Sequence, residues 1–244
     1  MKIALLGYGK MGKIIEEIAI SRGHTVVLKV DEHNAKSFTD AELKQADVAI
    51  EFTRPDAAIG NIRRCFAVGV PIVVGTTGWY DDIETIIAEC KSNNATLFHA
   101  SNFSIGVNLF FQVNERLAEL MNGFPEYNVV VDEIHHVHKL DAPSGTGITI
   151  ANGLLSKMPR KTKWQHYEGT APETVVETEL PIISHREGEV PGTHSVTYVS
   201  AVDRIEITHE AFNRKGFALG AVVAAEYTNG KKGVLNMRDL LKLS

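Results

Sequence analysis

The feature that most constrains the fold is an alternation of two patterns over the first hundred residues. Short runs rich in β-branched and other apolar residues predict strands at 2–7, 25–31, 47–53, 71–77 and 96–101. Stretches with apolar residues at three- and four-residue spacing predict helices at 10–23, 55–69 and 79–93. The alternation is typical of βαβ units and predicts a mostly parallel sheet whose strands are covered on both faces.

After residue 102 the rhythm changes. The pattern predicts a long apolar helix to about Asn122, a strand at 127–136, and a helix from Thr146 to about Lys157. Segments of period two then predict antiparallel strands at 174–184, 193–202 and 203–212. The tail is predicted to be helical and to pack back onto the first domain. We therefore expect an α/β fold with a parallel-sheet domain (1–103 and 216–244) and an α+β domain (104–215).

Charge and cysteine content narrow the classes of partner and compartment. The formal net charge is −5 at pH 7, whereas a nucleic-acid-binding protein normally concentrates positive charge on one face. We therefore expect a small-molecule partner. The chain has two cysteines, Cys65 and Cys90, which cannot supply a disulfide framework or a four-cysteine zinc site. No apolar run approaches the roughly 18 residues of a membrane helix. We therefore expect a cytoplasmic protein that binds neither nucleic acid nor membrane.

Three glycines follow the first predicted strand directly and open the first predicted helix. Gly7, Gly9 and Gly12 have the spacing G-x-G-x-x-G, in which the glycines allow a tight turn, approach of a pyrophosphate, and close helix–sheet packing. Asp31 lies 19 residues beyond Gly12, at the end of the second strand, where an acid can accept the ribose hydroxyls of NAD. The alternative is that these are turn glycines and that Asp31 merely ends a strand. The context favours a Rossmann-type dinucleotide site.

Asp31 also bears on the choice of nicotinamide. A carboxylate there repels a 2′-phosphate, so NADH is the preferred donor. Neighbouring basic residues keep NADPH as an alternative; they are Lys10, Lys13, Lys29, His33 and Lys36. Two polar segments, GTTG (75–78) and ASNFS (100–104), follow the fourth and fifth strands at the carboxyl edge, where such sheets bind ligands; ordinary polar loops are the alternative.

The segment HHVHK brings three imidazoles close to a lysine. His135, His136 and His138 suggest a metal site, but the segment has no cysteine, and Lys139 would place a positive charge beside the cation. On an extended strand His136 and His138 point to one side and His135 to the other, so the three do not converge locally. A second alternative is that they are ordinary core or loop histidines. Proton transfer beside a hydride donor is the better interpretation.

The next segment, DAPSGTG, is typical of a helix start. Pro143 ends the extended run, Ser144 is a plausible N-cap, and the helix that follows has N–H groups without internal partners. Such an end favours an anion, so a substrate carboxylate could bind there with Lys139 as its counter-charge. The alternative is a capped helix start and nothing more.

Six segments in order along the chain carry a resemblance: FTRP (52–55), GTTG (75–78), SNFSIGVN (101–108), EIHHVHKLDAPSGT (133–146), REGEVPGTH (186–194) and RIEITHEAFNRKGFALGA (204–221). They resemble the 4-hydroxy-tetrahydrodipicolinate (dihydrodipicolinate) reductases. The resemblance implies a Rossmann domain completed by the C-terminal tail, and an inserted α+β domain that binds substrate and forms a homotetramer. It also implies NAD(P)H-dependent reduction of a small cyclic dicarboxylate, 4-hydroxy-tetrahydrodipicolinate, to tetrahydrodipicolinate in the diaminopimelate route to lysine.

The resemblance also implies roles for individual residues. His135 matches the proton donor and Lys139 the second catalytic residue. His136, Gly145 and Thr146 match substrate contacts, the last two as a backbone site for a carboxylate. The positions that match dinucleotide contacts are Gly7, Tyr8, Gly9, Lys10, Met11, Gly12, Asp31, Gly75, Thr76, Thr77, Ala100, Ser101, Asn102 and Phe103.

The chain departs from the family pattern in places. Its glycine loop is one residue shorter than the common form, and Gly147 stands where alanine is frequent. Two other functions stay open at this point: another small two-domain dehydrogenase, and a non-catalytic nucleotide-sensing module. The presence of both His135 and Lys139 argues against the module, which would need neither.

Overall fold

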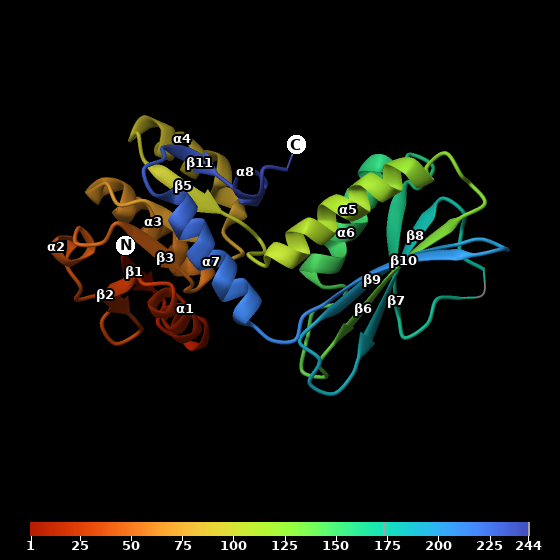
Figure 1. Ribbon diagram of the computed structural model, residues 1–244, viewed down its shortest axis with the longest axis horizontal. Coiled ribbons are helices and arrows are strands. Elements are labelled where there is room, and N and C mark those ends of the chain that lie inside the picture. Colours follow the sequence, from red (N-terminus) through yellow and green to blue (C-terminus); the bar gives the residue numbers. More distant parts are fainter. Residues whose placement is uncertain (173, 244) are drawn as a thin grey trace. The chain divides into compact units, whose positions relative to one another are not determined.

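The computed structural model describes residues 1–172 and 174–243, and the chain divides into two compact units (Figure 1). One unit comprises 1–105 and 215–244, and the other comprises 106–214. These limits lie within two residues of the predicted domain boundaries. The assignment of the cofactor to the first unit and of the substrate to the second stays a prediction.

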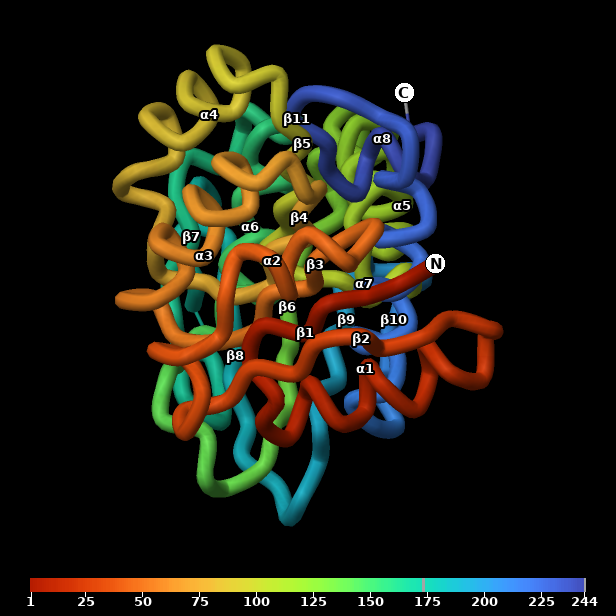
Figure 2. The backbone as a smooth tube through the Cα atoms, turned by 90° about the vertical axis from the view of Figure 1, so that its left-hand side faces the viewer, coloured from red at the N-terminus to blue at the C-terminus, as the bar shows by residue number. Residues whose placement is uncertain are grey.

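The first unit is built on a six-stranded sheet with the order β11-β5-β4-β3-β1-β2, in which every neighbouring pair is parallel (Figure 2). The strands are β1 (Lys2–Leu6), β2 (Thr25–Val30), β3 (Val48–Glu51), β4 (Ile72–Val74), β5 (Thr96–His99) and β11 (Gly233–Leu235). The chain runs from β1 outward to β2 and then returns to the other side of β1 to form β3. The predicted α/β class with a parallel sheet is therefore confirmed. The carboxyl ends of β1 and β3 mark the switch point at which sheets of this kind bind ligands.

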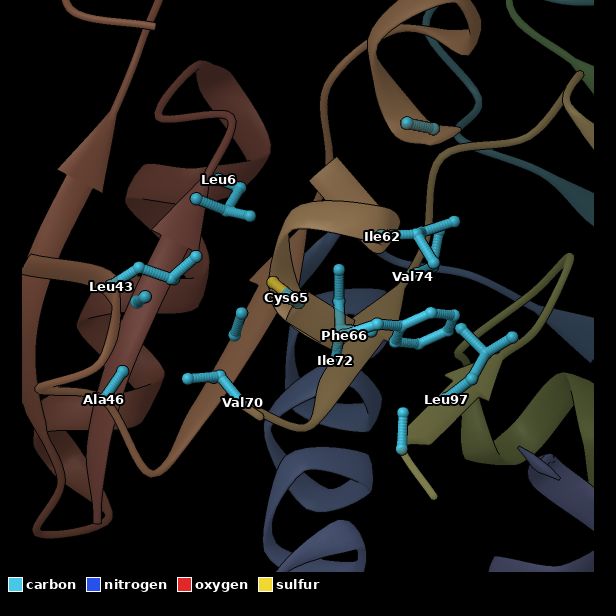
Figure 3. Close-up of a cluster of buried hydrophobic side chains, with 14 of the residues drawn as sticks. Leu6, Leu43, Ala46, Ile62, Cys65, Phe66, Val70, Ile72, Val74 and Leu97 are labelled. Atoms are coloured by element: carbon cyan, nitrogen blue, oxygen red, sulfur yellow. The ribbon is translucent and has the colours of Figure 1, made fainter. Parts of the chain in front are cut away.

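Helices cover both faces of this sheet. They are α1 (Lys10–Ser21), α2 (Asp40–Leu43), α3 (Pro55–Val68), a 3-10 turn η1 (Tyr80–Asp82), α4 (Ile83–Ser92), α7 (Lys215–Thr228) and α8 (Met237–Leu241). On one face, Ile62, Cys65 and Phe66 of α3 pack against Ile72 and neighbouring strand residues (Figure 3). On the other face, the alanine-rich side of α7 packs against β3, β4 and β5 together with α1.

The predicted boundaries of α3 have a clear local cause. Pro55 occupies the first turn, where its missing N–H is not needed, and Gly69 ends the helix in the left-handed conformation with φ of 76°. In contrast, the sequence pattern predicts no strand in the tail. Residues Gly233–Leu235 form β11, which extends the sheet beyond β5. A segment of three residues is too short to show the alternating pattern of a strand. It forms a strand because it pairs with the exposed edge of β5.

The second unit packs two helices, α5 (Ile105–Met121) and α6 (Gly145–Lys157), against a five-stranded sheet with the order β10-β9-β6-β8-β7. The strands are β6 (Asn128–His135), β7 (Lys163–Glu168), β8 (Glu179–Arg186), β9 (Thr193–Val199) and β10 (Arg204–Glu210). The predicted antiparallel strands at 193–202 and 203–212 correspond to β9 and β10.

The prediction of an antiparallel strand at 174–184 was wrong. Strand β8 begins at Glu179 and is parallel to both of its neighbours, β6 and β7. It is central, and its first four residues are all buried, so its pattern does not alternate in the way an edge strand's does. Strand β7 was not predicted either, because its many polar side chains give that edge segment the pattern of a loop. Within the described residues, no helix is long and apolar enough to cross a membrane.

Candidate functional site

The glycine loop between β1 and α1 is shaped by two close approaches of the backbone. Gly7 has φ of 99°, and a Cβ there would lie 2.0 Å from the carbonyl oxygen of Phe52. A Cβ at Gly12 would lie 2.4 Å from the carbonyl oxygen of Gly7, whereas one at Gly9 meets no atom within 4 Å. Only glycine therefore fits at positions 7 and 12, because a Cβ atom at either position would clash with a carbonyl oxygen. Gly9 leaves open space at the N terminus of α1, where a pyrophosphate can approach.

Asp31 is held immediately after β2. Its Oδ1 accepts the backbone N–H groups of His33 at 2.9 Å and Asn34 at 3.3 Å. The side-chain oxygen of Asn34 in turn accepts the N–H of Asp31 at 2.8 Å. These bonds fix the carboxylate at the carboxyl edge of the sheet, as a ribose-binding acid requires.

Tyr8, Lys10 and Met11 complete the loop and the first turn of α1. The hydroxyl of Tyr8 donates a hydrogen bond to Glu16, and Glu16 also forms an ion pair with Lys29 at 2.6 Å. The Lys29 ammonium lies 5.0 Å from the centroid of the Tyr8 ring. Sequence reasoning missed Glu16, because its partners are brought to it only by the packing of α1 on β2.

The predicted cofactor residues after β4 lie in a tightly packed loop. A Cβ at Gly75 would lie 2.1 Å from the ring of Phe52. Thr76 is buried; its hydroxyl accepts the N–H of Thr53 at 2.8 Å, and its carbonyl accepts the indole N–H of Trp79 at 2.8 Å. Thr77 follows and is exposed.

The predicted residues after β5 are Ala100, Ser101, Asn102 and Phe103. Asn102 accepts the N–H of Ser104 at 2.9 Å, and the Phe103 ring lies 5.8 Å from that of Phe98. Because the strands are parallel, this segment shares the carboxyl edge with the loops after β1, β2 and β4. The structure thus brings all fourteen predicted cofactor residues to one edge of one sheet.

Glu51 is a buried residue of this edge that sequence reasoning missed. It ends β3 and accepts hydrogen bonds from the backbone N–H of Thr53 at 3.1 Å, from the Thr53 hydroxyl, and from the amide of Asn61 at 3.4 Å. Burial raises the pKa of its carboxyl group, against these hydrogen bonds. An acid at the end of an otherwise apolar strand was the signal that could have identified it. It links the loops that follow β3 and β4.

In the second unit, His135 is the last residue of β6 and is buried. Its nearest ring is that of His194 on β9, with ring centroids 5.0 Å apart in an edge-on arrangement. His136 lies beyond the strand end, and its ring is 6.2 Å from that of His138. The structure therefore places His135 with a histidine 59 residues away rather than with its sequence neighbours.

Glu133 lies on the same face of β6 as His135 and is fully buried. Its carboxylate accepts the Ser144 N–H at 2.9 and 3.1 Å, the Ser144 hydroxyl, and the Ser184 hydroxyl at 2.8 Å. His194 Nε2 lies 3.2 Å from Ser144 Oγ and 3.7 Å from Glu133 Oε2. Burial raises the pKa of Glu133, but the nearby His194 and the hydrogen bonds from Ser144 and Ser184 outweigh it and bring the pKa to about 2. Glu133 is therefore an anion in this site.

Glu133, His135 and His194 offer nitrogen and oxygen atoms within 4.8 Å of one another. Both Glu133 oxygens already accept hydrogen bonds from Ser144, and Oε1 accepts one from Ser184 as well. The arrangement is that of a buried hydrogen-bond network. The metal hypothesis from the sequence concerned a different set, His135, His136 and His138, which the described part of the chain does not bring together.

His135 is held without charge in the free protein. Burial lowers its pKa to about 4; the neighbouring His194, Lys139 and Arg186 lower it further, and Glu133 opposes them. The buried Nδ1 atom has no hydrogen-bond partner among the described residues. The environment thus favours the neutral imidazole until negative charge is added nearby.

This depressed pKa predicts a pH dependence of stability. An unfolded histidine titrates near 6.5 and His135 at about 4, so the unfolded chain binds more protons between these values. The free energy of unfolding should therefore decrease as the pH falls from about 6.5 to 4, by at most about 3 kcal/mol from this residue. Urea denaturation across this range should show a smaller decrease for His135→Gln. An equal decrease in both proteins would contradict the assignment.

Lys139 lies in the loop between β6 and α6. Its ammonium contacts both carboxylate oxygens of Asp141, at 2.8 and 2.9 Å. The guanidinium of Arg186 donates to the carbonyl oxygens of Lys139 at 3.3 Å and Asp141 at 2.8 Å, so β8 holds this loop in place. Lys139 and Arg186 also line a cavity of about 470 Å³ in the second unit.

The helix start predicted from DAPSGTG is present. Ser144 is the N-cap of α6, and its hydroxyl accepts the N–H of Gly147 at 3.0 Å. Gly145 is exposed and a Cβ there would meet no atom within 4 Å, while Thr146 is half-buried. A Cβ at Gly147 would lie 2.5 Å from Glu133 Oε2. The helix end therefore combines a positive dipole with open space at Gly145, which suits an anion.

The parallel sheet with its glycine loop and fixed acid defines a dinucleotide-binding unit, and the second unit adds a lysine and a buried histidine beside a helix N terminus. These features are typical of a nicotinamide-dependent oxidoreductase. Residues 1–103 match the family model for the N terminus of dihydrodipicolinate reductase, and residues 106–241 match the model for its C terminus. The chain belongs to the dihydrodipicolinate reductase family.

Individual relatives agree with this assignment. The chain is 49% identical to the 4-hydroxy-tetrahydrodipicolinate reductase of Christiangramia forsetii over 245 residues, which cover 99% of this chain and 98% of the relative. It is 32% identical to that of Neisseria gonorrhoeae, with 100% and 98% covered. A dipicolinate-bound dihydrodipicolinate reductase from Paenisporosarcina sp. TG-14 shares the fold, with a TM-score of 0.76 at 21% identity and 98% of each chain covered. The resemblance identified from the sequence is thus confirmed, and the chain is an NAD(P)H-dependent reductase.

Proposed function

We propose that this chain reduces 4-hydroxy-tetrahydrodipicolinate to tetrahydrodipicolinate in the diaminopimelate route to lysine. Family membership supports the reaction. The observation that carries it at the level of residues is the joint presence of His135, Lys139 and the capped start of α6 within one short segment of the second unit. An acid, a cation and a helix end are the groups that a dicarboxylate needs for binding and protonation.

The residues of the first unit fit a dinucleotide. The open space at Gly9 and the close packing of Gly7 and Gly12 suit a pyrophosphate at the N terminus of α1. The loops after β4 and β5 (75–77 and 100–103) would hold the nicotinamide end. When bound, the nicotinamide supplies a hydride to C4 of the unsaturated imine that is left after loss of the 4-hydroxyl.

The second unit supplies binding and proton transfer. Lys139 and the backbone of Gly145 and Thr146 would hold the substrate carboxylates, and His136 would contact the substrate. His135 would donate a proton to the carbon next to C4. Because His135 is neutral in the free protein, it must gain its proton as the dicarboxylate binds, and the two negative charges of the substrate favour that gain.

NADH is the preferred donor in this proposal, with NADPH as the alternative. Asp31 presents a fixed carboxylate to the ribose, and Lys29, the basic residue two positions before it, is already paired with Glu16. A 2′-phosphate would therefore meet a negative charge without the help of Lys29.

The role of Asp31 gives a direct prediction. Asp31→Ala should weaken binding of NADH by roughly 10- to 100-fold, because a hydrogen bond to a charged group is lost, and should weaken NADPH less. Fluorescence titration with both cofactors measures the two dissociation constants. The adjacent acid Glu32, whose side chain is 88% exposed, provides the matched control Glu32→Ala. An equal change in both affinities for Asp31→Ala would remove it from the ribose site.

We also propose that the protein is a cytoplasmic homotetramer whose partner is the cyclic dicarboxylate, with neither nucleic acid nor membrane involved. The family resemblance supports the tetramer. In addition, β10 is an edge strand of the second unit's sheet, and Ile205 on it is 39% exposed. An exposed edge strand offers unpaired backbone N–H and C=O groups, which suits self-association. Sedimentation equilibrium that gives the mass of a monomer would overturn this proposal.

The activity is tested by following NADH absorbance while the preceding synthase condenses pyruvate with aspartate semialdehyde in the cuvette. Addition of the purified chain should cause oxidation that depends on both precursors. Absence of oxidation with NADH and with NADPH would overturn the proposed function.

A further inference from the structure

We infer that Glu133 is a positioning residue shared by two parts of the substrate site: it holds Ser144 at the start of α6 and, opposed by His194, sets the charge state of His135. The inference rests on the proposed function for its biological meaning. Its physical content concerns the free protein. Three observations carry it: the burial of all four side chains, their hydrogen bonds, and their register in the sheet.

The first link runs from Glu133 to the helix start. The carboxylate accepts both the N–H and the hydroxyl of Ser144, and the same hydroxyl caps the N–H of Gly147. Because Glu133 sits on a central strand between β8 and β9, it ties the first turn of α6 to the sheet. Gly145, the residue proposed to bind a carboxylate, follows Ser144 directly. A displacement of Glu133 would therefore displace the anion-binding end of the helix.

The second link runs from Glu133 to His135. The two residues share a face of β6, and His194 is paired directly opposite Glu133 on β9. The other charged groups that act on His135 are Lys139 in the following loop and Arg186, its register partner on β8. Glu133 is the negative member of this set, and it is the group that favours an imidazolium at His135. His194, Lys139 and Arg186 oppose it.

The opposing effects of Glu133 and His194 on the protonation of His135 matter for the proposed reaction. A permanently charged His135 would pair with a nearby anion, whereas a strongly apolar site would never let it accept a proton. With Glu133 and His194 acting in opposite directions, the added negative charge of a dicarboxylate shifts the balance toward the imidazolium form of His135. Protonation of His135 is thereby coupled to substrate binding.

The test follows the titration of His135 by NMR, through its ring Cε1–H signal, in the full-length protein without substrate. Glu133→Gln keeps the side-chain size but removes the negative charge, so the midpoint should fall by roughly one pH unit. His194→Gln removes a neighbouring imidazole that disfavours the imidazolium form of His135, so the midpoint should rise by a similar amount. Ser144→Ala should leave the midpoint nearly unchanged and weaken binding of pyridine-2,6-dicarboxylate, the probe used here, by roughly tenfold.

The matched control is Glu179→Gln. Glu179 is also a buried acid of this sheet, but it lies seven residues before Arg186 on β8, about 23 Å along the strand. This variant should not move the His135 midpoint. Opposite shifts in Glu133→Gln and His194→Gln support the inference, since a purely structural role would not produce opposite signs.

Shifts of the same sign, or an unchanged midpoint in either folded variant, would overturn the inference. If Glu133→Gln does not fold, the inference is tested by His194→Gln alone. A titration midpoint of His135 that does not rise in this variant would contradict the proposed effect of His194. The NADH oxidation assay of the unaltered protein is a separate measurement. A protein that lacks reductase activity but shows the two opposite shifts would overturn the proposed function and leave the electrostatic role of Glu133 in place.

Discussion

Replacement of His135 by alanine is expected to reduce kcat by roughly 10²- to 10⁴-fold, with a smaller effect on KM. The reduced carbon skeleton needs a proton at the carbon next to C4, and His135 is the buried imidazole of the HHVHK segment. Steady-state NADH oxidation with the synthase-generated substrate measures both constants. A loss in kcat at nearly constant KM is the pattern of an interaction made in the transition state.

His138→Ala is the matched control for that experiment. His138 belongs to the same HHVHK segment, but its side chain is 74% exposed, and it lies 3.4 Å from Glu189. Its replacement should leave kcat within about twofold, since surface substitutions away from special features have small effects. A wild-type rate in His135→Ala would contradict the role of His135 as proton donor.

Replacement of Lys139 by alanine is expected to lower kcat/KM by roughly 10²-fold, through a lower kcat and a higher KM for the dicarboxylate. The substitution removes a positive charge and also leaves the Asp141 carboxylate without the ammonium that lowers its pKa. An uncompensated anion would then repel the substrate. The effect should therefore exceed that of losing one hydrogen bond between neutral groups.

The double variant Lys139→Ala/Asp141→Ala separates these two contributions. If repulsion by Asp141 contributes, the double variant should bind the dicarboxylate more tightly than Lys139→Ala alone. Its kcat should stay low, because the catalytic cation is still missing. An unaltered kcat/KM in Lys139→Ala would remove Lys139 from the site.

The sequence predicted the first unit well because its signals are local. The five apolar runs and the glycine triplet each depend on residues close together in the chain. Pro55 and Gly69, for instance, delimit α3 by their own backbone preferences. The second sheet was harder, because the direction in which β8 pairs is decided by neighbours at a distance in sequence.

The same distinction applies to the candidate site. The sequence drew attention to His135 and Lys139 through their density in one segment. It did not predict that Glu133 and His194 lie beside His135. His194 reaches His135 only because β9 pairs with β6, and the role of Glu133 becomes visible only when Ser144 folds back over the strand. Buried polar groups brought together by tertiary structure are those that sequence patterns leave out.

The division of the chain has a consequence for the order of folding during synthesis. The second unit is one continuous segment, 106–214, whereas the first needs residues from both ends of the chain. Until α7 and β11 leave the ribosome, the face of the first sheet that contains Ile3, Leu5 and Val73 lacks the cover of α7, and β5 remains an open edge. The segment made in the middle can therefore reach its native state before the segment made first, which must wait for the last thirty residues.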